Sequence, residues 1–136
     1  RVKMKRSGVL NSNLSRIIAS MGHTDKLVVC DSGLPIPKNS DVIDLALTKN
    51  IPRFIDTLKV ILEELKVEEA VVTNELVTGN SKFYKEINSL LNGTKIKKVN
   101  HEKFKEITRN GGNVTFVRTG EATPYANIIL ISGVTF

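Results

Sequence analysis

The chain has only two histidines, and each lies where a loop meets a predicted strand. His23 precedes the apolar run 27–30, and His101 follows the run 96–99. Imidazole has an unperturbed pKa of about 6.5, so it can accept and release protons near neutral pH. A carboxylate, Asp31, ends the first of these runs. Two imidazoles and a carboxylate near strand ends indicate a proton-transfer site rather than a metal or nucleophile site.

The sequence lacks the motifs of competing chemistries. It has no His-x-x-x-His or Cys-x-x-Cys spacing for zinc, no Gly-x-Ser-x-Gly turn for a nucleophilic serine and no glycine-rich phosphate loop. The single cysteine, Cys30, lies inside an apolar run. We expect it to be a buried thiol in a reducing compartment, the cytosol, rather than a nucleophile. We therefore do not expect a metal site.

Composition and charge weigh against nucleic acids and membranes as partners. The 136 residues carry a formal net charge of +6, but carboxylates are interleaved with the basic residues and only 5% of residues are aromatic. A nucleic-acid surface would need a basic stripe with aromatic side chains for stacking. No apolar stretch approaches the ~20 residues that span a bilayer. We expect neither class of partner.

The length and the hydrophobic content of 40% predict a single domain with a proper core. We interpret residues 1–3, which precede Met4, as an expression remnant, so the domain covers residues 4–136. We expect helices near 13–21, 52–65, 81–91 and 102–109, and strands near 26–31, 41–45, 70–73, 95–99, 114–118 and 128–132. This alternation predicts an α/β fold, a mostly parallel sheet with helices on both faces. The last two strands have no helix between them, so either one of them runs antiparallel or the chain crosses over without a helix.

In such sheets, ligands bind beyond the carboxyl ends of the parallel strands. Asp31 ends the first strand, His101 follows the fourth and Arg-Thr-Gly-Glu at 118–121 ends the fifth, so three polar clusters should converge at one rim. The polar loop at 119–127 has the length of many functional loops. His23 precedes its strand and should lie at the opposite edge. It reaches the rim only if its loop folds over or if another subunit supplies it.

Each candidate residue also has an ordinary structural explanation. His23 can cap the carbonyl groups at a helix end, and His101 can be a structural residue near a helix start. Asp31 can cap a turn, Tyr125 can be a half-buried aromatic, and Asn127 can be a turn residue. Taken one at a time, these residues leave both interpretations open.

Five segments of the chain carry a more specific signal together than separately. They are residues 7–12, 22–26, 31–37, 100–104 and 118–127. In this order they resemble the D-ribose pyranase branch of the ribose/fucose mutarotase family, and the similarity extends from Met4 to Phe136. Gly-His-Thr-Asp or Arg-Thr-Gly-Glu alone would be a weak signal, whereas the complete ordered set is highly specific.

The resemblance implies an isomerase that interconverts β-D-ribopyranose and β-D-ribofuranose by acid–base catalysis, without cofactor or metal, in support of ribose use. It implies a homo-oligomer, two stacked pentameric rings with sites between neighbouring subunits. In the family's pattern, His23 matches the catalytic proton donor, and Asp31, His101, Tyr125 and Asn127 match sugar-binding positions. Two alternatives stay open: a fucose-type mutarotase that acts only at the anomeric carbon, and a non-catalytic sugar-binding module.

Overall fold

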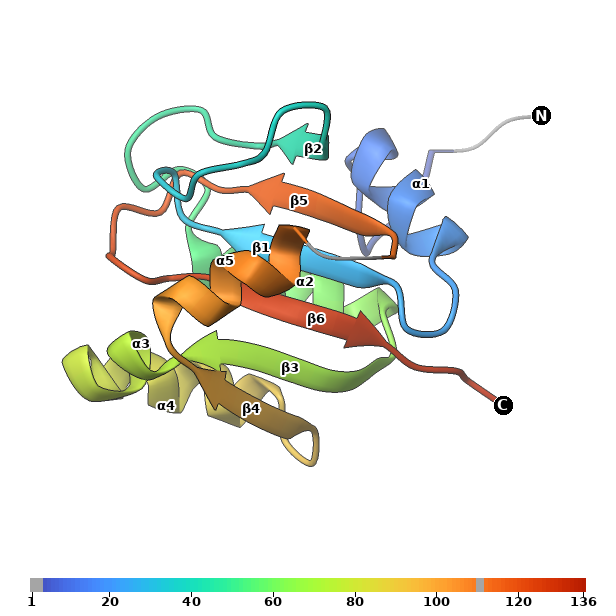
Figure 1. Ribbon diagram of the computed structural model, residues 1–136. Coiled ribbons are helices and arrows are strands. Elements are labelled where there is room, and N and C mark those ends of the chain that lie inside the picture. The colour runs from blue at the N-terminus through green and yellow to red at the C-terminus, as the bar shows by residue number, and fades with distance from the viewer. Residues whose placement is uncertain (1–3, 110–111) are drawn as a thin grey trace.

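The computed structural model describes residues 4–109 and 112–136, so the remnant expected at residues 1–3 lies outside the described residues. Along the chain, the elements are α1 (Ser12–Ser20), β1 (Lys26–Cys30), β2 (Asp41–Asp44), α2 (Phe54–Glu64), β3 (Val67–Thr73), α3 (Asn74–Gly79), α4 (Ser81–Leu90), β4 (Lys95–Val99), α5 (His101–Arg109), β5 (Val114–Arg118) and β6 (Ile128–Ser132) (Figure 1). None of these helices has both the length and the apolar character needed to cross a bilayer.

The strands form a single mixed sheet in the order β2-β5-β1-β6-β3-β4. β6 is antiparallel to both of its neighbours, β1 and β3, and every other neighbouring pair is parallel. The reversal occurs after the loop from β5 to β6, which contains no crossover helix. β1 and β2 are also joined without a helix, but both run parallel to β5, which lies between them. The prediction of an α/β fold with a mostly parallel sheet is confirmed.

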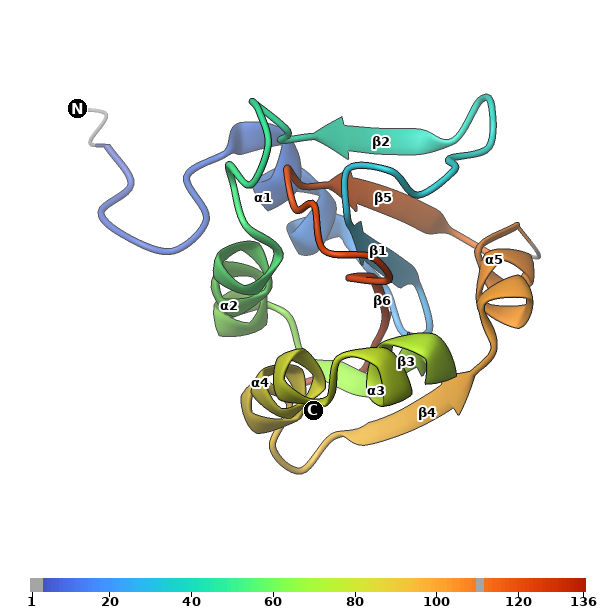
Figure 2. The same ribbon diagram turned by 90° about the vertical axis from the view of Figure 1, so that its left-hand side faces the viewer.

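Alternating side chains of the central strand supply a buried cluster on each face of the sheet. In β1, Leu27 and Val29 belong to the larger cluster, whereas Val28 and Cys30 belong to the smaller cluster on the opposite face. α1, α2 and α4 cover the larger cluster, and α5 covers the smaller one, with the fully buried Phe104 as its anchor (Figure 2). Helices therefore cover both faces, as predicted, but in unequal numbers.

Around β3 the structure differs from the sequence-based expectation. The strand begins at Val67 rather than near residue 70. The sequence pattern did not indicate this earlier start, because the charged residues Glu68 and Glu69 interrupt the apolar run, and the strand register shifts between Val67 and Glu69. The strand leads directly into α3, a helix that was not predicted. Thr73 caps α3 by accepting a hydrogen bond from the N–H of Leu76 at 3.1 Å. Six residues are too few to show helical periodicity in a sequence.

Candidate functional site

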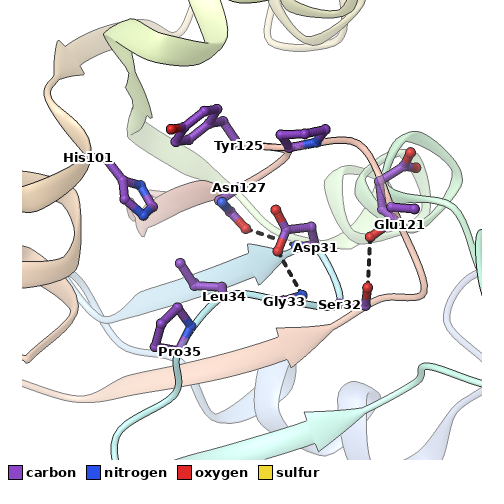
Figure 3. A pocket seen from close by; sticks show the side chains of 11 residues that line it. Asp31, Ser32, Gly33, Leu34, Pro35, His101, Glu121, Tyr125 and Asn127 are labelled. Atoms are coloured by element: carbon purple, nitrogen blue, oxygen red, sulfur yellow. Dashed lines mark hydrogen bonds between the residues drawn. The ribbon is translucent and has the colours of Figure 1, made fainter.

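A cavity of about 410 Å³ opens at the carboxyl ends of the parallel strands (Figure 3). Four of the five predicted site residues line it: Asp31, His101, Tyr125 and Asn127. Asp31 follows β1, and His101 begins α5. Because β6 runs antiparallel, the residues that precede it lie at this same edge, which brings Asn127 beside Asp31. The structure thus brings together polar groups from three separate parts of the chain.

Asp31 is held by its own turn and by Asn127. Its backbone N–H donates to the Oδ1 atom of Asn127 at 2.8 Å, and its own Oδ1 accepts from the N–H of Gly33 at 3.0 Å. Burial raises the pKa of the Asp31 carboxyl, while hydrogen bonds from Gly33, Leu34 and Asn127 and the nearby His101 oppose the rise. The carboxylate keeps acceptor positions that a hydroxylated ligand in the cavity can use.

Tyr125 and His101 meet across the mouth of the cavity. Their rings pack edge to face, with centroids 5.1 Å apart and planes at 81°. Tyr125 has a φ of +62°, a left-handed conformation that is rare for a bulky residue. The N–H of Asn127 donates to the Tyr125 carbonyl at 2.8 Å and helps to hold this turn. Unusual backbone conformations of this kind cluster at functional sites.

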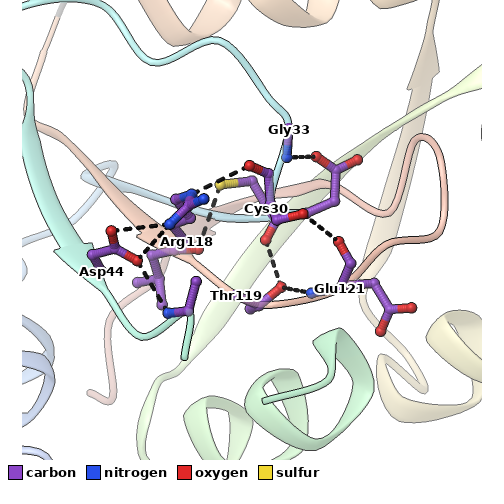
Figure 4. Close-up of polar contacts among 10 residues, drawn as sticks. Cys30, Gly33, Asp44, Arg118, Thr119 and Glu121 are labelled. Carbon is purple, nitrogen blue, oxygen red and sulfur yellow. Dashed lines mark hydrogen bonds and ion pairs between the residues drawn. The ribbon is translucent and has the colours of Figure 1, made fainter. Parts of the chain in front are cut away.

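The loop 119–127 is fastened to the end of β1 (Figure 4). Thr119 donates from its N–H and its hydroxyl to the carbonyl oxygen of Cys30, at 3.0 and 2.7 Å. Ser32 donates from its N–H and its hydroxyl to the carbonyl oxygen of Glu121, at 2.9 and 3.1 Å. These four bonds hold the segments that follow β1 and β5 together at the cavity.

Sequence reasoning placed Glu121 at the rim but gave it no role. Its side chain is only 1% exposed, and its carboxylate accepts from the N–H of Phe54 at 2.9 Å and from the hydroxyl of Thr123 at 2.7 Å. The guanidinium of Arg53 lies 3.6 Å from the same carboxylate. Glu121 therefore ties the loop that carries Tyr125 to the start of α2. The Arg-Thr-Gly-Glu motif was the available signal for this residue.

His23 lies away from this cavity. It is exposed in the turn before β1, and its Nε2 atom is 3.1 Å from the Oε1 atom of Glu68. β1 separates it from Asp31, and at about 3.3 Å per residue the five residues of that strand alone span roughly 16 Å. The position at the opposite edge agrees with the prediction from strand direction. Within one chain, His23 does not reach the other four residues.

Cys30 has the buried environment that its sequence context predicted. Desolvation by burial is the main cause that raises the pKa of its thiol to about 12, so the thiol stays protonated at neutral pH. It is free, and it donates a weak hydrogen bond to the carbonyl of Val117. Among residues 4–109 and 112–136, no three His, Cys, Asp or Glu side chains are grouped so that they could hold a metal ion.

Sequence relatives match nearly the full length of the chain. The D-ribose pyranase of Coprothermobacter proteolyticus is 54% identical over 133 residues, which cover 98% of this chain and 100% of the relative. The D-ribose pyranase of Clostridium perfringens is 50% identical with the same coverage.

Solved structures extend the comparison to the fold. Bacillus subtilis RbsD complexed with D-ribose matches with a TM-score of 0.91 at 43% identity, covering 98% of this chain and 100% of that one. The fucose mutarotase of Streptococcus pneumoniae in complex with L-fucose matches with a TM-score of 0.74 at 26% identity, covering 93% and 94%. The sequence profile of the RbsD / FucU transport protein family matches residues 4–135. The predicted family is confirmed: this chain belongs to the RbsD / FucU family.

Proposed function

We propose that this protein is a D-ribose pyranase, an isomerase that interconverts β-D-ribopyranose and β-D-ribofuranose. The observation that carries the proposal is the cavity where Asp31, His101, Tyr125 and Asn127 meet, in a fold shared with ribose-bound RbsD. The identity of 54% to a D-ribose pyranase, against 26% to a fucose mutarotase, favours ribose over fucose. We place the reaction in the cytosol, where a free thiol such as that of Cys30 stays reduced.

The chemistry of ring exchange suits these side chains. Opening a cyclic hemiacetal removes a proton from the anomeric hydroxyl and delivers one to the ring oxygen, and closure through a different hydroxyl reverses these transfers. Positioned acids and bases contribute roughly 10²–10⁴-fold to such a step. In our proposal, Asp31 and Asn127 hold sugar hydroxyls, Tyr125 offers its ring face or phenol, and His101 binds a further hydroxyl. His23 is the proton donor.

We also propose that the active form is an oligomer in which one subunit supplies His23 to the cavity of its neighbour. Two observations support this: four site residues meet within one chain, and His23 stands exposed at the far edge of the same sheet. Contacts between unlike edges of identical subunits repeat head to tail, and they close into a ring when the rotation between neighbouring subunits allows it. Two stacked pentameric rings, the arrangement that the family resemblance implied, would meet this requirement.

Acceleration of ring exchange is the direct test of the proposed function. Saturation-transfer NMR on D-ribose labelled with ¹³C at C1 measures the exchange rate between pyranose and furanose forms. We expect the protein to increase this rate, an added chelator to leave the increase unchanged, and L-fucose anomers to exchange more slowly at equal protein concentration. Ribose binding without faster exchange would instead identify a non-catalytic sugar-binding module, and an unchanged rate without binding would reject the sugar site.

Ribose affinity is expected to fall in acid as Asp31 takes up a proton. Burial raises the pKa of this carboxyl above its usual 3.8, so protonation starts at a higher pH than for an exposed aspartate. The ionised form accepts sugar hydroxyls, so affinity is complete above this pKa and declines below it. Calorimetric titration between about pH 7 and about pH 4, with circular dichroism to follow folding, measures the decline.

Asp31→Asn is the matched control for this titration. It keeps a side-chain oxygen for the N–H of Gly33 but cannot ionise. We expect weaker ribose binding that lacks the acid decline of the wild type. Wild-type affinity that stays constant to about pH 4 would contradict the predicted role of the ionised Asp31 carboxylate, and the same decline in the variant would assign the acid effect to another group.

A further inference from the structure

Two buried side-chain atoms near the cavity have no hydrogen-bond partner among the described residues: Oε1 of Glu75 and Nδ1 of His101. Buried polar atoms are nearly always paired, because an unpaired one has lost its contact with water. These two belong to residues that already touch, since the backbone N–H of His101 donates to the Oε2 atom of Glu75 at 3.0 Å. One atom is an acceptor, and the other can carry a hydrogen.

The covalent geometry of the two residues places these atoms within reach of each other. Nδ1 is the ring nitrogen closer to the backbone of its own residue, and the two oxygens of Glu75 belong to one planar carboxylate. A carboxylate bound to the backbone N–H of His101 can therefore meet the Nδ1–H group after small side-chain rotations. We propose that Glu75 is a positioning residue that accepts this hydrogen and fixes the tautomer of His101, with Nε2 left as an unprotonated acceptor.

The inference adds a positioning residue to the proposed sugar site. The effect of Glu75 on catalysis therefore rests on the proposed function. His101 lines the cavity, and its ring points into the space beside Tyr125 and Asn127 (Figure 3). With hydrogen on Nδ1, the Nε2 atom accepts a sugar hydroxyl; with the opposite tautomer, Nε2 would donate instead. A carboxylate behind an imidazole sets this choice in many enzyme sites.

Helix capping alone does not explain the second oxygen of Glu75. The first turn of α5 already has a cap, because Oδ1 of Asn100 accepts from the N–H of Lys103 at 2.7 Å. The N–H of His101 needs a single acceptor, and Oε2 of Glu75 provides it. The remaining buried oxygen has a use only if a further donor reaches it, and Nδ1–H of His101 is the donor that the structure offers.

The test is Glu75→Gln, read by ¹⁵N NMR of the histidine ring nitrogens at about pH 8, where an ordinary imidazole is neutral. With two histidines in the chain, a spectrum of His23→Ala assigns the signals. We expect the wild type to hold hydrogen on Nδ1. The glutamine oxygen can still accept from the backbone of His101, but its amide NH₂ then faces Nδ1 as a donor, so the tautomer should reverse. The kcat for ring exchange should fall roughly 100-fold, with a smaller change in KM.

Glu102→Gln is the matched control, because it removes a charge next to His101 in sequence without touching its ring. Glu102 is exposed and pairs with Lys105 at 3.0 Å, so both the ring spectrum and kcat should stay as in the wild type. A wild-type ring with hydrogen on Nε2, or an unchanged tautomer in Glu75→Gln, overturns the inference. A lower melting temperature with an unchanged tautomer and kcat would show that Glu75 is only structural. If the wild type does not accelerate exchange, the proposed function fails, whereas the ring spectra still decide the role of Glu75.

Discussion

Replacing His23 by alanine is expected to slow ring exchange roughly 10²–10⁴-fold, the contribution of one positioned acid or base. The fold should persist, because the imidazole is exposed and pairs only at the surface with Glu68; such pairs contribute little to stability. Ribose should still bind, since Asp31 and Asn127 are untouched. Saturation-transfer NMR measures the rate, and circular dichroism checks the fold. A folded variant with nearly wild-type exchange would show that His23 is not the proton donor.

Mixed oligomers show whether His23 acts across a subunit boundary. His23→Ala leaves the cavity wall intact, and Asp31→Asn leaves the histidine intact, so we expect each variant alone to be slow. Co-expressed with different tags, the two variants should recover about a quarter of the wild-type rate. In a ring assembled at random from equal amounts of the two chains, one site in four combines a native Asp31 from one subunit with a native His23 from its neighbour. Co-expressing two differently tagged His23→Ala chains is the control. No recovery, or a fully active monomer in sedimentation, would contradict a shared site.

The fold was largely predictable because its signals are local. Apolar strands alternate with amphipathic helices along most of the chain, and strand direction alone placed His23 at the edge opposite Asp31. The order of the strands is not local. β4 is an edge strand, separated from β1 by β6 and β3. His101, the first residue of α5, lines the cavity at the point where this helix starts to cross the sheet with Phe104 buried against it. No periodicity in the sequence specifies that crossing.

The supporting residues of the site were harder to predict than the residues that line it. Asp31 and Asn127 have polar side chains next to strands, a position where function is expected. Glu75 enters through α3, a helix too short to leave a pattern. Glu121 meets the N–H of Phe54 from 67 residues away, and its carboxylate is buried where charged groups are rare. Such partnerships depend on tertiary packing, so residue types and spacing do not reveal them.

Gly120 is the position where the smallest substitution should damage the fold most. A Cβ atom there would clash with the carbonyl oxygens of Thr48 and Ile51, and it would lie only 2.8 Å from the carbonyl carbon of Ile51, closer than non-bonded atoms approach. These are backbone atoms, and hydrogen bonds fix the segment on both sides. The N–H of Gly120 donates to the carbonyl of Pro52 at 2.9 Å, and its carbonyl accepts from the N–H of Asn50 at 2.6 Å. The added methyl group cannot be accommodated without breaking them.

Gly120→Ala is therefore expected to destabilise the protein by about 3 kcal/mol, at the upper end of the range for overpacking. It should also weaken ribose binding, because the displaced loop carries Tyr125 and Asn127. Denaturant unfolding at equal protomer concentration measures the change, since assembly makes stability depend on concentration. Gly79→Ala is the control: no atom lies within 4 Å of its added Cβ, so its stability should stay within about 0.5 kcal/mol of the wild type. Equal stability of the two variants would mean that the 48–52 turn yields to the methyl group and does not fix the loop.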